Sequence, residues 1–133
     1  MTIRNGVYFI LFFLFSGCGK GTVSAPNDPA PTGTIVAQGQ FAGLNSKSVS
    51  GVAVIYQTGS SYVARLEGIS VPNEAGLQVV VKTSTTTVLQ TTLRNISGTQ
   101  NYSFSVSDGA VTWSSVTIHS TATNLDYGTA LLK

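Results

Sequence analysis

The feature that most constrains the fold of this chain is an alternation of apolar and polar residues, which recurs in short runs from residue 34 onward. Successive side chains of a β-strand point to opposite faces, so this alternation buries one face of a sheet and exposes the other. Tyr102, Phe104 and Val106 alternate with small polar residues in this way. Since no convincing apolar run at helical spacing competes with it, the pattern predicts strands.

Turn-forming residues divide this region into candidate strands. Gly59-Ser60, Ser97-Gly98 and Asp108-Gly109 are expected at tight turns, because glycine readily adopts the positive φ that such turns need. Pro72 falls between strands, where its missing amide hydrogen costs no ladder bond. The predicted strands are 35–41, 49–57, 62–67, 77–82, 88–93, 102–106, 115–120 and 127–132. They predict one all-β domain over residues 34–133, a small antiparallel β-sandwich or barrel of about eight strands.

The composition fits a single extracytoplasmic domain. Charged residues make up only 9% of the 133 residues, and the formal net charge is +2. Near-neutrality argues against a nucleic-acid partner, because phosphate recognition needs clustered lysine and arginine.

Residues 1–17 have the order of a secretory signal peptide. A positive charge at Arg4 precedes the apolar run 7–15, and the small residues Ser16 and Gly17 follow that run. A run of about nine residues is much shorter than the roughly 20 that a membrane-spanning helix needs. The segment is therefore expected to direct export and to be removed.

The tetrapeptide Phe15-Ser16-Gly17-Cys18 resembles the lipobox of bacterial lipoproteins, although leucine is commoner at its first position. The resemblance implies cleavage before Cys18 and lipid attachment to its thiol. Two acyl chains are enough for stable anchoring. Gly19 follows where aspartate would be the usual inner-membrane signal, so the resemblance implies a cell-envelope protein, in the outer membrane if the cell is Gram-negative.

Residues 18–33 connect this cysteine to the domain. Three of the four prolines lie here and core-forming residues are scarce. The segment is predicted to be a flexible linker that holds the domain clear of the lipid headgroups.

Several segments between residues 38 and 132 resemble the DM thirteen domain, a small all-β module of secreted and membrane-tethered proteins for which electron transfer is proposed. Gly98-Thr99-Gln100-Asn101-Tyr102 looks like the family's Gly-x-Gln-x-Tyr, and the run 115–120 followed by 127–131 looks like its last two strands. The family's motif positions fall on Gly98, Gln100, Tyr102, Ser120 and Gly128.

The chain departs from the family where function is concerned. Ser120 stands at the near-universal cysteine, and His119 stands at the preceding tryptophan. A hydroxyl cannot cycle between thiolate and oxidised sulfur, so the family's redox role does not carry over to this residue. Strand parity predicts that Ser120 faces the core with its hydroxyl bonded to backbone, whereas His119 is exposed.

Few side chains offer reactive or metal-binding chemistry. One histidine and one cysteine exclude the usual zinc and copper sites. A site at His119 with carboxylates is an alternative, as is a serine–histidine–acid triad, although no Gly-x-Ser-x-Gly motif is present. The acids available to such a site are Glu67, Glu74, Asp108 and Asp126.

Three other sites have a simpler structural interpretation. Glu67 and Glu74 could form a glycosidase pair, but a surface ion pair between Arg65 and Glu67 is the simpler interpretation. Asp108 could be a calcium ligand, but a hairpin turn at Asp108-Gly109 is the simpler interpretation. A carbohydrate-stacking platform competes with ordinary core and rim packing of the same aromatic residues. Those residues are Tyr56, Tyr62, Tyr102, Trp113 and Tyr127.

Two hypotheses about function follow. The first is an envelope-anchored, non-catalytic binding or structural module without a cofactor, whose partner is an unknown protein or small molecule. The second is the redox accessory role proposed for the family. We expect no enzymatic activity.

Overall fold

The computed structural model describes residues 25–107 and 110–133. The signal peptide, Cys18 and the Asp108-Gly109 turn lie outside the described residues. The described part contains eight strands and confirms the all-β fold class. They are β1 (Thr34–Gly43), β2 (Ser50–Thr58), β3 (Ser61–Ser70), β4 (Leu77–Thr83), β5 (Thr87–Thr92), β6 (Ser97–Ser105), β7 (Trp113–Ser120) and β8 (Leu125–Leu131). No helix long and apolar enough to cross a membrane occurs among these residues.

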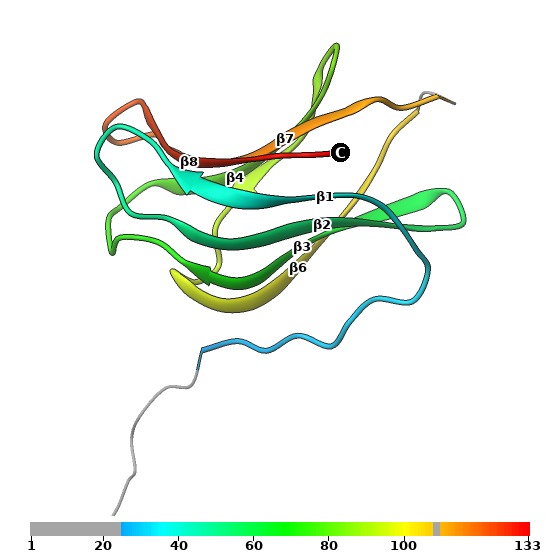
Figure 1. Ribbon diagram of the computed structural model, residues 1–133, viewed down its shortest axis with the longest axis horizontal. Coiled ribbons are helices and arrows are strands. Elements are labelled where there is room, and N and C mark those ends of the chain that lie inside the picture. The colour runs from blue at the N-terminus through cyan, green and yellow to red at the C-terminus, as the bar shows by residue number, and fades with distance from the viewer. Residues whose placement is uncertain (1–24, 108–109) are drawn as a thin grey trace, which may run out of the picture.

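The strands form one antiparallel sheet in the order β5-β4-β7-β8-β1-β2-β3-β6. The sheet folds over into a nearly closed barrel, with β4, β7 and β8 above β1, β2, β3 and β6 in Figure 1. Strand β1 joins the two layers, since Thr34 to Gln40 pair with β2 whereas Phe41 to Gly43 pair with β8. β5 and β6 are the two ends of the sheet.

The core fills the space between the layers. The residues of the core cluster recur every second position along β4 and β7, as the alternation predicted, although Val80 and Thr117 on the opposite face are buried as well. Val79, Ile118, Ile55 and Leu66 have no more than 1% of their surface exposed. Burying each such side chain contributes about 1.5–3 kcal/mol, so core packing is the main force holding the layers together.

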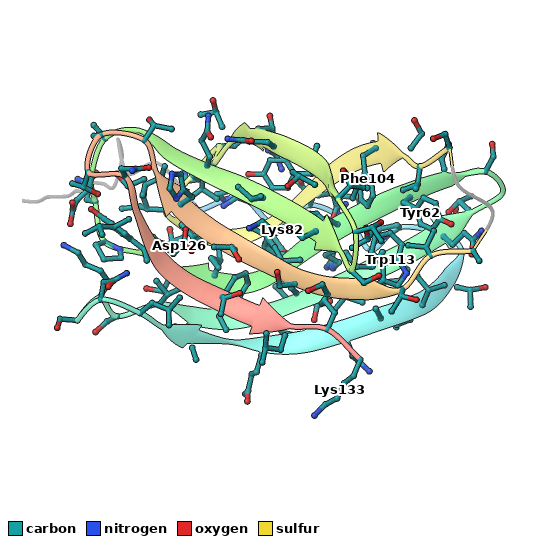
Figure 2. The ribbon with its side chains drawn as sticks, turned by 90° about the horizontal axis from the view of Figure 1, so that it is seen from above. Tyr62, Lys82, Phe104, Trp113, Asp126 and Lys133 are labelled. Carbon is teal, nitrogen blue, oxygen red and sulfur yellow. The ribbon has the colours of Figure 1, made fainter. Side chains whose placement is uncertain are left out.

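The barrel has two distinct ends. We call the end formed by residues 44–49, 71–76, 93–96 and 121–124 the loop end, and the opposite end, with the β2–β3 and β4–β5 turns, the turn end. Tyr62, Phe104 and Trp113 pack together at the turn end, with ring centroids 5.1–6.0 Å apart. Figure 2 shows these three rings gathered at one end of the molecule.

The predicted turns are confirmed in part. Gly59 has φ 61° in the β2–β3 turn, and Pro72 lies between β3 and β4. The prediction of a tight turn at Ser97-Gly98 is wrong, because both residues belong to β6. Gly98 has φ 93° beside an irregularity in the β3–β6 register, so its positive φ serves a distorted strand start rather than a hairpin.

A short segment before the barrel is bound to the sheet. We call residues Pro26 to Pro29 the strap. Thr99 N donates to Pro26 O (2.7 Å) and Asp28 N donates to Thr99 O (3.1 Å), so the strap runs parallel to β6 along the edge that β3 leaves free. A flexible linker was expected over residues 18–33, but this part of it is held against the barrel (Figure 1).

Candidate functional site

Asp28 fixes the strap to the barrel through both its carboxylate and its backbone carbonyl. Oδ2 accepts a hydrogen bond from Asn101 N (3.0 Å) and pairs with Arg94 Nη2, while Arg65 Nη1 donates to the backbone oxygen (3.0 Å). The Asn101 amide, followed by the Arg94 guanidinium, lowers the pKa of Asp28 below its ordinary value. The carboxylate is therefore ionised at neutral pH, as this set of donors requires.

Gly98 allows the strap to approach β6 closely. A Cβ built on this residue would lie 2.4 Å from Pro26 O and 3.0 Å from Ala25 Cβ. Any side chain would therefore push the strap off the sheet edge, and φ 93° would strain the backbone as well. The glycine of the Gly-x-Gln-x-Tyr motif thus has a packing role.

Gln100 and Tyr102 form a buried polar network beneath the β5–β6 connection. Gln100 is fully buried, and its Nε2 donates to Asn95 O (2.6 Å). Tyr102 OH donates to Gln100 Oε1 (2.6 Å) and accepts from Arg94 N (2.9 Å). The two motif side chains therefore set the conformation of residues 94–97, which carry the Arg94 partner of the strap.

Ser120 lies in the interior, as strand parity predicted. It is 0% exposed, and its Oγ donates to Ala75 O (3.5 Å) and accepts from Thr123 N (3.3 Å). The predicted backbone partners of its hydroxyl are thus confirmed. Gly128 is buried as well, since a Cβ there would lie 2.7 Å from Val49 Cβ. All five motif positions are internal contacts of the fold.

His119 is less exposed than predicted, and it lines a depression on the outer face of β4 and β7. Its side chain is 24% exposed, and Nδ1 lies 2.8 Å from Asp126 Oδ1. Lys82 and Asp126 mark this face in Figure 2. The depression has a volume of about 250 Å³ and is lined by Val80, Lys82, Thr87, Gln90, Thr117, His119 and Asp126.

A larger groove opens at the loop end of the barrel. Its volume is about 410 Å³, within the ~300–1,000 Å³ of small-molecule sites. It lies between the β3–β4 loop, the β5–β6 connection and Thr121. The lining residues are Glu74, Gly76, Leu77, Gln78, Thr92, Leu93, Arg94, Asn95, Ile96 and Thr121.

The charged residues of this groove are engaged by partners from other segments. Lys47 Nζ lies 3.1 Å from Glu74 Oε2, and Tyr127 OH donates to the other carboxylate oxygen. These two contacts, that of Tyr127 first, lower the pKa of Glu74. Arg94 pairs with Asp28 of the strap. The groove therefore presents hydrogen-bonding groups and apolar surface with little net charge.

Neither the groove nor the outer-face depression is lined by Phe, Tyr or Trp. The structure also decides between several of the alternative sites that the sequence left open. Arg65 Nε and Glu67 Oε2 form the expected ion pair (2.9 Å), although Arg65 is only 11% exposed. The alternative of a carbohydrate-stacking platform is wrong, since Tyr62, Tyr102 and Tyr127 are buried. Among the described residues, no three His, Cys, Asp or Glu side chains gather as metal ligands, and His119 accepts or donates no hydrogen bond to a serine.

The residues that bind the strap to the barrel were not predicted from the sequence. Asp28 lies in a proline-rich segment whose composition indicates a linker, and Arg94 lies outside any motif. Their contact joins residues 66 positions apart, so no local pattern reports it.

Comparison with known proteins gives no family assignment. No protein-family model, curated protein or solved structure matches this chain.

Proposed function

We propose that this chain is a lipid-anchored protein of the bacterial cell envelope, whose β domain is a non-catalytic module that binds a small polar ligand in the groove at the loop end. The anchor rests on the lipobox-like Phe15-Ser16-Gly17-Cys18. The observation that carries the binding role is the groove itself, which lies at the mouth of a barrel and has the size of a ligand site.

The groove lining favours a neutral ligand with one apolar face. Gln78, Asn95 and Thr121 offer amide and hydroxyl groups, while apolar side chains of β4 and of the β5–β6 connection supply the rest. Since Glu74 and Arg94 are already paired, a charged ligand would have to displace Lys47 or the strap. A saccharide fits this chemistry best, and its binding should depend little on salt concentration.

The burial of Ser120 argues against the rival redox role. The family's proposed electron transfer requires a cysteine at this position, and the oxygen that replaces its sulfur is enclosed and bonded to backbone groups. We therefore propose that this domain, although it resembles the DM thirteen domain in part of its sequence, binds a ligand rather than transfers electrons.

Nuclear magnetic resonance titration tests the binding role. Neutral and acidic oligosaccharides are added to the mature chain with Cys18→Ser, and the amides that shift are mapped. We expect neutral sugars to perturb the groove residues, and Thr121→Tyr, which fills the groove from an exposed position, to abolish the effect. Thr87→Tyr in the outer-face depression is the matched control. Binding that survives Thr121→Tyr, or no response to any sugar, would contradict the proposal.

Mass spectrometry and cell fractionation test the anchor. The mature protein should begin at Cys18 and carry acyl chains, and Cys18→Ala should release it from the membrane fraction. Ser16→Ala keeps a small residue before the cysteine and should leave processing unchanged. An unprocessed leader, or membrane association of Cys18→Ala equal to that of the wild type, would refute lipid anchoring.

A further inference from the structure

The strap determines where the chain leaves the barrel. Ala25 and Pro26 lie against Gly98, the second residue of β6, and β6 starts at the loop end. From there the strap runs parallel to β6 toward the turn end, where β1 begins. The described chain therefore begins, at Ala25, beside the loop end of the barrel.

The docked strap also limits the distance between the barrel and Cys18. Seven residue steps separate Cys18 from Ala25, and a fully extended chain of that length spans at most about 25 Å. If the strap were free, the tether would extend to residue 33 and its maximum length would roughly double. Docking therefore shortens the tether and fixes the point from which it starts.

We infer that the loop end of the barrel, with its groove, faces the bilayer that holds the Cys18 lipid, while the turn end points away from it. The inference rests on the lipid anchor proposed above. Strands of ten residues such as β1 and β3 span about 33 Å, which exceeds the length of the docked tether. A barrel held with its loop end toward the bilayer therefore places its turn end beyond the reach of the docked tether.

The surface chemistry of the loop end suits a position in the aqueous headgroup layer. Large apolar side chains exposed by at least 40% of their surface are few among the described residues, and two of the three, Ile35 and Leu131, lie toward the turn end. Lys47 and Glu74 of the loop end pair with each other. The loop end is therefore polar with balanced charge, and the tether rather than lipid charge sets the orientation.

Energy transfer to labelled lipids tests this orientation in the full mature lipoprotein, reconstituted into vesicles. Because lipid occupies the thiol of Cys18, a single introduced cysteine takes the fluorophore: Thr123→Cys at the loop end or Ser60→Cys at the turn end. Both positions are exposed. We expect transfer to headgroup acceptors to be several-fold higher from position 123, in zwitterionic and in anionic vesicles alike.

Variants of the strap contact separate docking from simple tethering. Asp28→Ala removes the carboxylate that joins the strap to Arg94 and Asn101, and should reduce the difference between the two labels. Asp126→Ala removes an acid that pairs only with His119 among the described residues, and should leave the difference intact. Equal transfer from both labels in the lipidated protein, or higher transfer from position 60, overturns the orientation alone. Mass spectrometry that finds Cys18 without lipid overturns the anchor and the orientation together.

Discussion

Replacing Gln100 with leucine tests whether the buried polar network holds the β5–β6 connection. Leucine has a similar volume and avoids a large cavity, but it removes the donor to Asn95 O and Ser97 O and the acceptor for Tyr102 OH. Each buried polar group left without a partner costs about 1–3 kcal/mol. Since residues 95 and 97 are only half-buried, water recovers part of this loss, and we expect a total of about 2–4 kcal/mol.

Urea unfolding of the mature chain with Cys18→Ser measures this cost. With a slope of about 2 kcal/mol per molar urea, the middle of the usual range, the midpoint should fall by roughly 1–2 M. Gln90→Leu is the matched control, because Gln90 is exposed and bonds only to the side chain of Gln78 among the described residues. Its effect should stay within about 0.5 kcal/mol.

A double-mutant cycle with Tyr102→Phe then isolates the bond between the two side chains. Each single variant breaks the same Tyr102 OH to Gln100 Oε1 bond, so the double variant should cost about 0.5–3 kcal/mol less than the sum of the single variants. A loss below about 1 kcal/mol for Gln100→Leu, or fully additive effects, would refute the network as an energetic unit.

Three further predictions concern the strap, Ser120 and Gly128. Asn101 and Arg94 lower the pKa of Asp28 in the folded protein. The contribution of Asp28 to the free energy of unfolding is therefore fully present above the unfolded pKa of about 4, and it is lost as the pH falls toward the folded pKa. Urea unfolding should therefore show a stability difference between the wild type and Asp28→Asn at pH 6 that shrinks at pH 3, and a constant difference would contradict this. Ser120→Cys, in the Cys18→Ser background, should resist alkylation in the native state and react on unfolding, whereas rapid native labelling would show that the position is accessible. Gly128→Ala should cost about 1–3 kcal/mol through the clash with Val49, measured by urea midpoint, and Val49→Ala should relieve part of it if the clash is the cause.

The secondary structure of the barrel follows from local patterns in the sequence. Seven of the eight strands lie within three residues of their predicted ends, because the period-two pattern is a local property that each strand satisfies against its own core face, whereas β6 begins five residues before its predicted start. The same parity placed Ser120 inside, with its hydroxyl bonded to backbone. The His119 side chain was placed on the correct face, but its partial burial depends on neighbouring strands.

Tertiary structure decided the features that join distant parts of the chain. The order of the strands brings the β3–β4 loop, the β5–β6 connection and Thr121 together around the groove. The strap is held by Asp28 contacts to residues 37 to 73 positions away, so its proline-rich composition gave no sign of docking. Composition and alternation report what each segment does alone, whereas a groove or a docked edge depends on which segments the folded sheet places side by side.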